Sequence, residues 1–208
     1  MSDTVFSLAK DELFDLTKLD PGIKDFYIGL DWDPSVSGED IDLDAVLIAV
    51  GSDGMALANK HSECFLFYGN HGRNGTPAAF QVTEDNRDGS DDFNNDIDDD
   101  EAIFCYSDKI DPDIQELRVF VTFHDAGGRT LNDVSRVGLR IAPLVNNVPD
   151  FGNGKTATFD VRDVGASEGA HMASIVRNNV AGWDIKPVGE QSGNLSQVAS
   201  IHGIGTKS

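Results

Sequence analysis

The sequence is poor in basic residues: 16 lysines and arginines stand against 36 aspartates and glutamates, which gives a formal net charge of −20. A surface this acidic repels nucleic-acid phosphates and anionic lipid headgroups, so neither is expected as a partner. The sequence also lacks any run of about 20 apolar residues, and it does not open with a basic stretch followed by an apolar one. Direct membrane insertion is therefore not expected.

Cysteine is scarce as well. Cys64 and Cys105 are the only two, and both lie in apolar runs, ECFLFY and AIFCY. Their separation is not a metal-binding spacing, and two cysteines are too few for the disulfide scaffold of a small secreted domain. We expect two buried free thiols, with a disulfide as the alternative, and a reducing, cytoplasmic location.

Helical periodicity is weak throughout the chain. Segments in which apolar and polar residues alternate dominate instead, and turn signals such as SDG and FGNG separate them. The predicted strands are residues 26–33, 42–51, 63–69, 78–85, 102–108, 117–125, 137–144, 156–163 and 182–189. Residues 129–137 and 167–178 are helical candidates, and the second segment fits a strand equally well.

So many short strands predict an all-β fold, namely an antiparallel two-sheet β-sandwich. Residues 1–190 are expected to form a single domain, because no linker rich in Pro, Gly or Ser divides them. Residues 191–208 are polar and rich in Gly and Ser, and we expect a partly flexible C-terminal tail there.

The acidic residues are concentrated in two stretches. Asp31–Asp44 carries six acids and no base, and Glu84–Glu101 carries ten acids and one base. Together these stretches hold −15 of the net charge of −20. A surface that is acidic only for solubility would spread its acids more evenly. We therefore expect long acidic loops with a specific role at one end of the sandwich.

Three explanations are open for carboxylates crowded at strand ends. Most charge runs are solvated loops. A pair of carboxylates can perform acid–base catalysis, as in glycosidases, but this chemistry needs only two acids. A Ca²⁺ site recruits six to eight hard oxygen ligands, which explains why many Asp, Asn and Glu residues would gather in one place.

The spacing of the acids favours calcium. Residues two apart in a strand share a face, so Asp31 projects with Asp33, and Asp42 projects with Asp44. Both pairs lie at strand ends, where neighbouring loops converge. The other candidates flank the long acidic loop: Asp85, Asn86 and Asp88 follow one predicted strand, and Asp98, Asp99, Asp100 and Glu101 precede the next.

Two residues next to these acids have expected places of their own. Trp32 lies between Asp31 and Asp33, faces the opposite way, and is expected in the core of the sandwich. His124 ends a predicted strand beside Asp125, where either residue could border the calcium region. A surface or hydrogen-bonded role is favoured for His124.

Familiar functional motifs are absent. The acidic loop is not an EF-hand, because placing Gly89 at the sixth position puts Asn95 at the twelfth, where the bidentate Glu belongs. The GNGKT segment lacks the first glycine of a phosphate-binding loop and has Pro149 in its place. The sequence contains neither HExxH nor GxSxG. No catalytic residues are predicted, and an enzyme is not expected.

The order of motifs along the chain carries a resemblance. LDWD, DLDA with an apolar strand and a Gly turn, FLFYGN, DNRDG and a later DDE follow one another, framed by FSLAK…FDLTK, HDAGGRTLNDVSRV and TFDVRD…GWDIKPVGE. Over roughly residues 5 to 190, this set resembles the TerD family of tellurium-resistance and stress proteins. The resemblance implies a β-sandwich that binds two Ca²⁺ ions. It also implies a role in tolerance of tellurite, phage and colicins, in assemblies with membrane-associated partners.

The resemblance also implies a set of metal ligands. Asp31, Asp42 and Asp44 match the family's early acids, Asp85 and Asn86 match its DN, and Asp99, Asp100 and Glu101 match its DDE. Asp33 joins them through its spacing from Asp31. The loop between DN and DDE departs from the family because SDDFNNDI makes it longer. Further candidates in this region are Asp88, Asp91, Asp92, Asp96 and Asp98.

We therefore expect a non-enzymatic, cytoplasmic calcium-binding protein of a tellurium-resistance or stress-response system. Its calcium-ordered loops are expected to form an interaction surface for other proteins of a stress-resistance assembly. One alternative is an acidic interaction protein that mimics nucleic acid and needs no metal. The other is a metal-dependent carboxylate hydrolase, for which the sequence offers no apolar setting that would raise the pKa of an acid.

Overall fold

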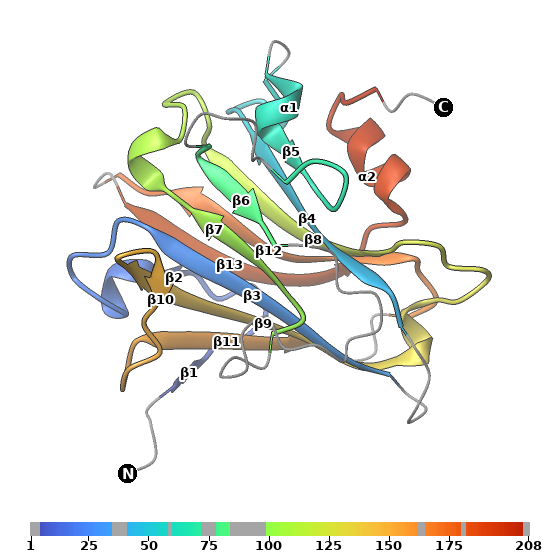
Figure 1. Ribbon diagram of the computed structural model, residues 1–208, viewed down its shortest axis with the longest axis horizontal. Coiled ribbons are helices and arrows are strands. Elements are labelled where there is room, and N and C mark those ends of the chain that lie inside the picture. The colour runs from blue at the N-terminus through green and yellow to red at the C-terminus, as the bar shows by residue number, and fades with distance from the viewer. Residues whose placement is uncertain are drawn as a thin grey trace.

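The strands form two sheets packed face to face (Figure 1). The computed structural model describes residues 5–34, 41–57, 60–71, 78–83, 99–161, 165–179 and 182–205. Sheet A contains, in spatial order, β1 (Val5–Ser7), β11 (Thr156–Val161), β9 (Val134–Val145), β3 (Phe26–Pro34), β7 (Glu101–Cys105) and β6 (Phe80–Val82), with β10 (Val148–Pro149) paired to β9. Sheet B contains β2 (Phe14–Asp15), β13 (Trp183–Gln191), β12 (Gly169–Arg177), β8 (Glu116–Phe123), β4 (Leu43–Val50) and β5 (Phe65–Leu66).

The predicted all-β sandwich is thus confirmed. One pairing differs from an antiparallel arrangement, because β1 lies parallel to β11. Cys64 and Cys105 are buried free thiols, as expected, and burial raises the pKa of both. In the part of the chain that the structure describes, no helix is long and apolar enough to cross a membrane.

The core lies between the sheets and fixes which face of each strand points inward. Phe26 of β3 packs against Trp183 of β13, with the ring centroids 6.3 Å apart. Trp32 shares the inner face of β3 with Phe26 and is 3% exposed, as its alternation with the flanking acids predicts. Asp31 and Asp33 therefore lie on the outer face of sheet A.

The same alternation defines the outer face of sheet B. The register pairs Asp44 with Thr122 and Ile48 with Arg118 across β4 and β8. Leu117 lies opposite Ile175, and Ile175 lies opposite Ile185. Ile185 is two residues from Trp183, so all three share the inner face with Trp183. Arg118, the next residue after Leu117, is therefore on the outer face. Arg118, Thr122 and Asp44 consequently face outward, and Arg118 contacts His202, which follows α2 (Leu195–Ile201).

Two segments differ from their predictions. Residues 129–137 do not form a helix: a 3₁₀ turn, η3 (Leu131–Asp133), leads into β9, whose alternating Val137 and Leu139 are buried in the core. The predicted strand at 63–69 is shortened, because α1 (His61–Cys64) precedes β5. Residues 167–178 contain β12, the strand alternative. Two more 3₁₀ turns are η1 (Leu16–Lys18) and η2 (Ser107–Lys109).

The expected polar tail contains α2 and packs on the outer face of sheet B. Asn194 caps the helix in a capping box with Gln197, and Val198 and Ala199 are fully buried. The helix forms because the cap satisfies its first amide groups while these apolar residues bury against the sheet. The described residues of this segment extend to Gly205.

A polar network anchors α2 through His202, the residue that follows it. The His202 Nδ1 atom is 2.7 Å from the Val198 carbonyl oxygen, and Nε2 is 2.9 Å from Arg118 Nη1. A carbonyl only accepts and a guanidinium only donates, so the ring is neutral with its proton on Nδ1. Arg118 also donates to Glu116 Oε2 at 2.9 Å, and Ser174 Oγ donates to Glu116 Oε1 at 2.5 Å.

His171 lies in the same network. Its ring stacks on Phe120 at 4.5 Å, and its Nε2 atom lies 3.3 Å from Ser174 Oγ. Burial, and next the Arg118 charge, lower the pKa of His171 to about 4. The pKa of His202 is also lowered, chiefly by burial and further by Arg118. Both histidines are therefore held neutral at pH 7.

We predict that the free energy of unfolding falls as the pH drops below about 6.5, the ordinary histidine value. In that range the two histidines bind protons in the unfolded chain but not in the folded chain. The free energy of unfolding therefore falls by about 1.4 kcal/mol per pH unit for each fully shifted histidine. Urea denaturation of the wild type and of His171→Gln between pH 4.5 and 7.5 measures the effect. The variant should show the shallower loss in acid, and parallel curves would contradict the prediction.

Candidate functional site

Three strand ends meet at one end of the sandwich, and they carry most of the predicted acids that the structure describes. These are the end of β3, the start of β4 and the start of β7. Trp32 of β3 is tied to the segment before β4, because its Nε1 donates to the Ile41 carbonyl oxygen at 2.9 Å. Strands β4 and β7 belong to different sheets and lie against each other here. The site is therefore at the seam between the sheets.

Glu101 bridges the two sheets. Its side chain leaves the first residue of β7, and Oε2 accepts a hydrogen bond from the Ala45 amide of β4 at 2.6 Å. Among the described strands, β5 covers this edge of β4 only at Leu47 and Ile48. Glu101 therefore accepts a hydrogen bond from an amide on the edge of β4 that β5 does not reach. A carboxylate can accept several hydrogen bonds, so this contact does not use all of its acceptor capacity. The residue is 1% exposed.

Asp100 plays the corresponding part at the end of β3. Its Oδ2 accepts from the Trp32 amide at 2.8 Å, beyond the point where the described β3–β7 pairing ends at Leu30 and Glu101. Asp100 and Glu101 are thus neighbouring buried carboxylates that each take an amide from a different sheet.

Asp44 is a fully buried carboxylate on the outer face of sheet B. His124 Nδ1 lies 3.5 Å from its Oδ2. Opposite Asp44, Thr122 is also fully buried, and its Oγ1 makes no hydrogen bond within the described part of the chain. A buried hydroxyl without a partner is costly, which is the pattern expected where an ion or water completes a site. Thr122 and Asp44 supply the hard oxygen donors that Ca²⁺ prefers.

Asp42 lies just before β4 and is half-buried. The His124 amide donates to its carbonyl oxygen at 3.2 Å, so the end of β8 is tied to this segment. Asp42 and Asp44 therefore both lie beside His124. The sequence suggests that either His124 or Asp125 could border the acidic region, and His124 does.

Asp31 and Asp33 project together, as their spacing predicts, but toward a different place. Both bind Arg136 of β9 on the outer face of sheet A, Asp33 Oδ2 at 2.8 Å from Nε and Asp31 in a close ion pair with Nη2. Asp160 adds a third carboxylate at 3.4 Å from Nη1. The structure thus places this pair apart from Asp44, on the outer face of the other sheet.

Asp99 also lies on the outer face of sheet A. It accepts a hydrogen bond from the Tyr27 hydroxyl at 2.8 Å, and Arg140 Nη2 lies 3.3 Å from its other oxygen. Gly29 makes room for this carboxylate, because a Cβ atom there would lie 2.1 Å from Asp99 Oδ2. Asp99 is fully buried in a polar cluster separate from Asp100 and Glu101. Burial, followed by the Asp99 charge, raises the pKa of Tyr27.

Several candidates fall outside the described residues. These are Asp85, Asn86, Asp88, Asp91, Asp92, Asp96 and Asp98. Within the described ranges, no group of three or more His, Cys, Asp or Glu side chains is close enough together to hold a metal ion. Sequence reasoning missed Thr122, which lies within an apolar strand. It also missed Tyr68, whose ring is 4.5 Å from that of His124.

The fold and this site define a class of protein: an acidic two-sheet β-sandwich with buried carboxylates at the seam between its sheets. The TerD domain model matches residues 5–202, nearly the whole chain. The chain belongs to the TerD family, and the resemblance in the motifs is confirmed.

Relatives span the same length. The tellurium resistance protein TerD of Serratia marcescens is 29% identical over 202 residues, which cover 95% of this chain and 97% of that protein. An uncharacterized Bacillus subtilis protein, YceE, is 30% identical over 208 residues with the same coverage. General stress protein 16U of Bacillus subtilis is 27% identical over 204 residues, again with coverages of 95% and 97%.

Solved structures support the fold. A homologue of telluride resistance protein TerD from Streptomyces coelicolor superposes with a TM-score of 0.57 at 20% identity, covering 88% of this chain and all of that one. A second structure, of a protein of unknown function, gives 0.58 at 19% identity and covers 89% of this chain and 99% of that one.

Proposed function

We propose that this protein is a non-enzymatic calcium-binding module of a tellurium-resistance or stress-response system. Ca²⁺ would order the acidic loops, and the ordered loops would form a surface for other proteins of the assembly. The proposed number of ions is two, and the proposed location is cytoplasmic. Names of relatives supply the link to tellurium resistance, and the acidic seam supplies the link to calcium.

One observation carries the calcium proposal: Asp44, Asp100 and Glu101 are buried where β3, β4 and β7 meet, and the Thr122 hydroxyl opposite Asp44 has no hydrogen bond from the described residues. A cation bound among buried carboxylates lowers the cost of keeping them charged away from water. Asp42 adds a fourth acid at the same strand end. We assign these four acids as the primary ligand candidates, with Asp85 and Asn86 as further ligands from the acidic loop.

Three other predicted acids, Asp31, Asp33 and Asp99, have arginine partners on the outer face of sheet A. Arg136 binds Asp31 and Asp33, and Arg140 with Tyr27 binds Asp99. Their role in this proposal is to keep sheet A in register next to the site. Calcium would supply charge neutralisation at the seam, and its binding energy would appear as stability of the folded chain.

The test is a calcium titration by calorimetry on chelator-stripped protein. We expect two saturable sites in the wild type. The double variant Asp42→Asn/Asp44→Asn should lose more than about 100-fold in affinity at one site or both, since even outer-layer partners of a metal contribute 10- to 100-fold. Asparagine keeps the size of each side chain, so the fold should persist, which near-ultraviolet circular dichroism checks.

A matched control removes two charges elsewhere. Asp108 and Asp113 are exposed and lie before β8, at the opposite end of that strand from Thr122. Asp108→Asn/Asp113→Asn should bind calcium as the wild type does. If the Asp42/Asp44 variant keeps both sites, the ligand assignment fails. If the wild type gives no heat, the metal-free alternative, an acidic surface for a basic partner, replaces the calcium module.

A further inference from the structure

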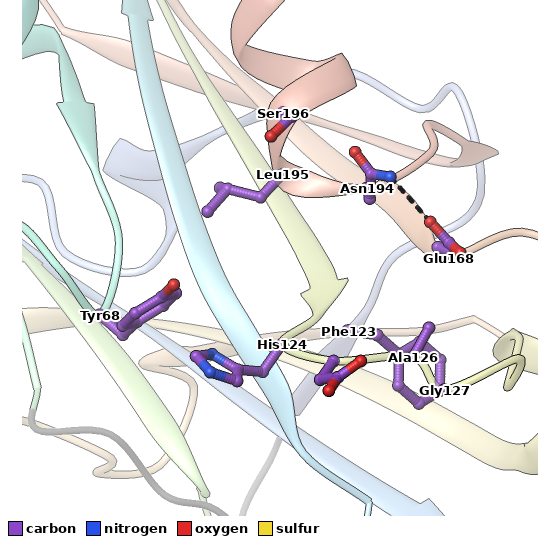
Figure 2. A pocket seen from close by; sticks show the side chains of 10 residues that line it. Tyr68, Phe123, His124, Ala126, Gly127, Glu168, Asn194, Leu195 and Ser196 are labelled. Atoms are coloured by element: carbon purple, nitrogen blue, oxygen red, sulfur yellow. Dashed lines mark hydrogen bonds between the residues drawn. The ribbon is translucent and has the colours of Figure 1, made fainter. Parts of the chain in front are cut away.

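A pocket opens beside the acidic seam on the outer face of sheet B. Its volume is about 360 Å³, and it lies between the end of β8, the start of α2 and the segment after β5. Figure 2 shows Tyr68 and His124 on one side of the pocket, and Glu168, Asn194 and Ser196 on the other. This size is near the lower end for ligand pockets and suits one side chain or a small molecule.

One wall of the pocket is aromatic. The rings of Tyr68 and His124 meet edge to face, 4.5 Å between centroids at an angle of 66°. Asp44 Oδ2 lies 3.5 Å from His124 Nδ1, and Asp44 is fully buried, so this contact helps to position the His124 ring. The Tyr68 ring therefore offers an electron-rich face to a cation.

The opposite wall carries negative charge. Glu168 is held in place by Asn194, whose Nδ2 donates to Oε2 at 2.9 Å across the dashed line in Figure 2. Asp125 is a second carboxylate, and it is exposed at the pocket rim. The ten described residues that line the pocket include no lysine or arginine. Glu168 and Asp125 each bring a carboxylate to the described lining.

Aromatic rings facing carboxylates select an organic cation. A guanidinium stacks on rings and also donates paired hydrogen bonds to a carboxylate, whereas an ammonium is a point charge. Calcium fits less well, because it needs six to eight oxygens, and the described lining offers two carboxylates, those of Asp125 and Glu168. The net charge of −20 favours a basic surface as the source of the cation.

We propose that this pocket binds an arginine side chain presented by a basic partner protein. The guanidinium stacks on the Tyr68 ring, with the edge of the His124 ring beside it, and pairs with Glu168, while Asp125 adds attraction. The pocket gives the proposed interaction surface a specific anchor. It requires no calcium, so it stands or falls separately from the metal site.

The test uses N-acetyl-arginine amide as the probe, titrated into the full chain in excess calcium and followed by NMR. The ring resonances of Tyr68 and His124 should shift, with a dissociation constant on the order of millimolar for so small a ligand. N-acetyl-citrulline amide has the same shape without the charge and should bind at least about ten-fold more weakly, since hydrogen bonds to charged groups are the stronger kind.

Variants locate the effect. Glu168→Gln/Asp125→Asn should weaken the arginine probe about ten-fold or more, and Tyr68→Leu should weaken it without touching a carboxylate. Asp108→Asn/Asp113→Asn, the charge-matched control, should bind like the wild type. Equal binding of the arginine and citrulline probes would overturn the proposal. So would a wild type whose Tyr68 and His124 resonances do not move, whatever the calcium titration shows.

Discussion

Chelator-stripped protein is expected to melt about 10–20 °C below the same protein in excess calcium. A ligand that binds only the folded state at about 100 times its dissociation constant adds roughly 2.7 kcal/mol per site. For a chain of this size, each kcal/mol moves the melting temperature by about 2–4 °C. The physical reason is repulsion: Asp42, Asp44, Asp100 and Glu101 all lie at the strand ends of one seam, and bound calcium would offset their negative charge.

Differential scanning calorimetry at fixed ionic strength measures this shift. Magnesium at the same concentration controls for general screening, and it should give a small shift because it prefers octahedral geometry and keeps its waters. The Asp42→Asn/Asp44→Asn variant should show a higher melting temperature than the wild type in chelator and a smaller gain with calcium. A calcium shift matched by magnesium would reduce the effect to screening of an acidic surface.

Replacing Arg140 by methionine is expected to cost about 3–5 kcal/mol of unfolding free energy. Asp99 is fully buried, and Arg140 is its cationic partner at 3.3 Å. Methionine removes the charge and keeps an apolar stem beside Phe151, whose ring centroid lies 5.2 Å from the Arg140 guanidinium. The Tyr27 hydroxyl still donates to the buried carboxylate, but the guanidinium charge is gone. Urea denaturation in chelator, with the slope held common, gives the difference.

A second variant separates the lost charge pair from lost packing. Asp99→Asn/Arg140→Met removes both charges, and it should recover most of the stability that the single variant loses, because no isolated buried charge remains. An Arg140→Met protein within about 0.5 kcal/mol of the wild type, the range usual for surface changes, would mean that Asp99 does not depend on Arg140.

Alternation in the sequence was a reliable guide to the strands and to the faces of the site residues within them. Asp31 and Asp33 do share a face, and Trp32 does turn inward. Their partner Arg136 lies more than 100 residues away. Local spacing gives the direction of a side chain and not the distant group that it meets, so the separation of these acids from Asp44 could not be predicted from local spacing.

The start of β7 shows a second limit. Asp99 and Glu101 are two residues apart and would share a face if the strand continued through them. The chain bends at Asp100, and Asp99 turns to the outer face beside Gly29 while Glu101 points to Ala45. A one-residue bend at a strand end leaves no periodic signal in the sequence.

Helix α2, by contrast, left a signal that could have been used. Asn194 and Gln197 are spaced as a capping box, and Val198 and Ala199 follow as the buried pair. Seven residues are too few for helical periodicity to stand out against a Gly- and Ser-rich background.

The pairing of the first strands with the last ones has a consequence for how the chain acquires its shape. β1 joins β11, β2 joins β13, and β3 lies between β7 and β9. Neither sheet is complete until the last third of the polypeptide has left the ribosome. Until then, the edges of the N-terminal strands have no pairing partner from the later strands. Contacts this distant in sequence close slowly, on a scale of milliseconds to seconds. Unpaired strand edges of this kind make a folding intermediate prone to aggregation until the sheets close.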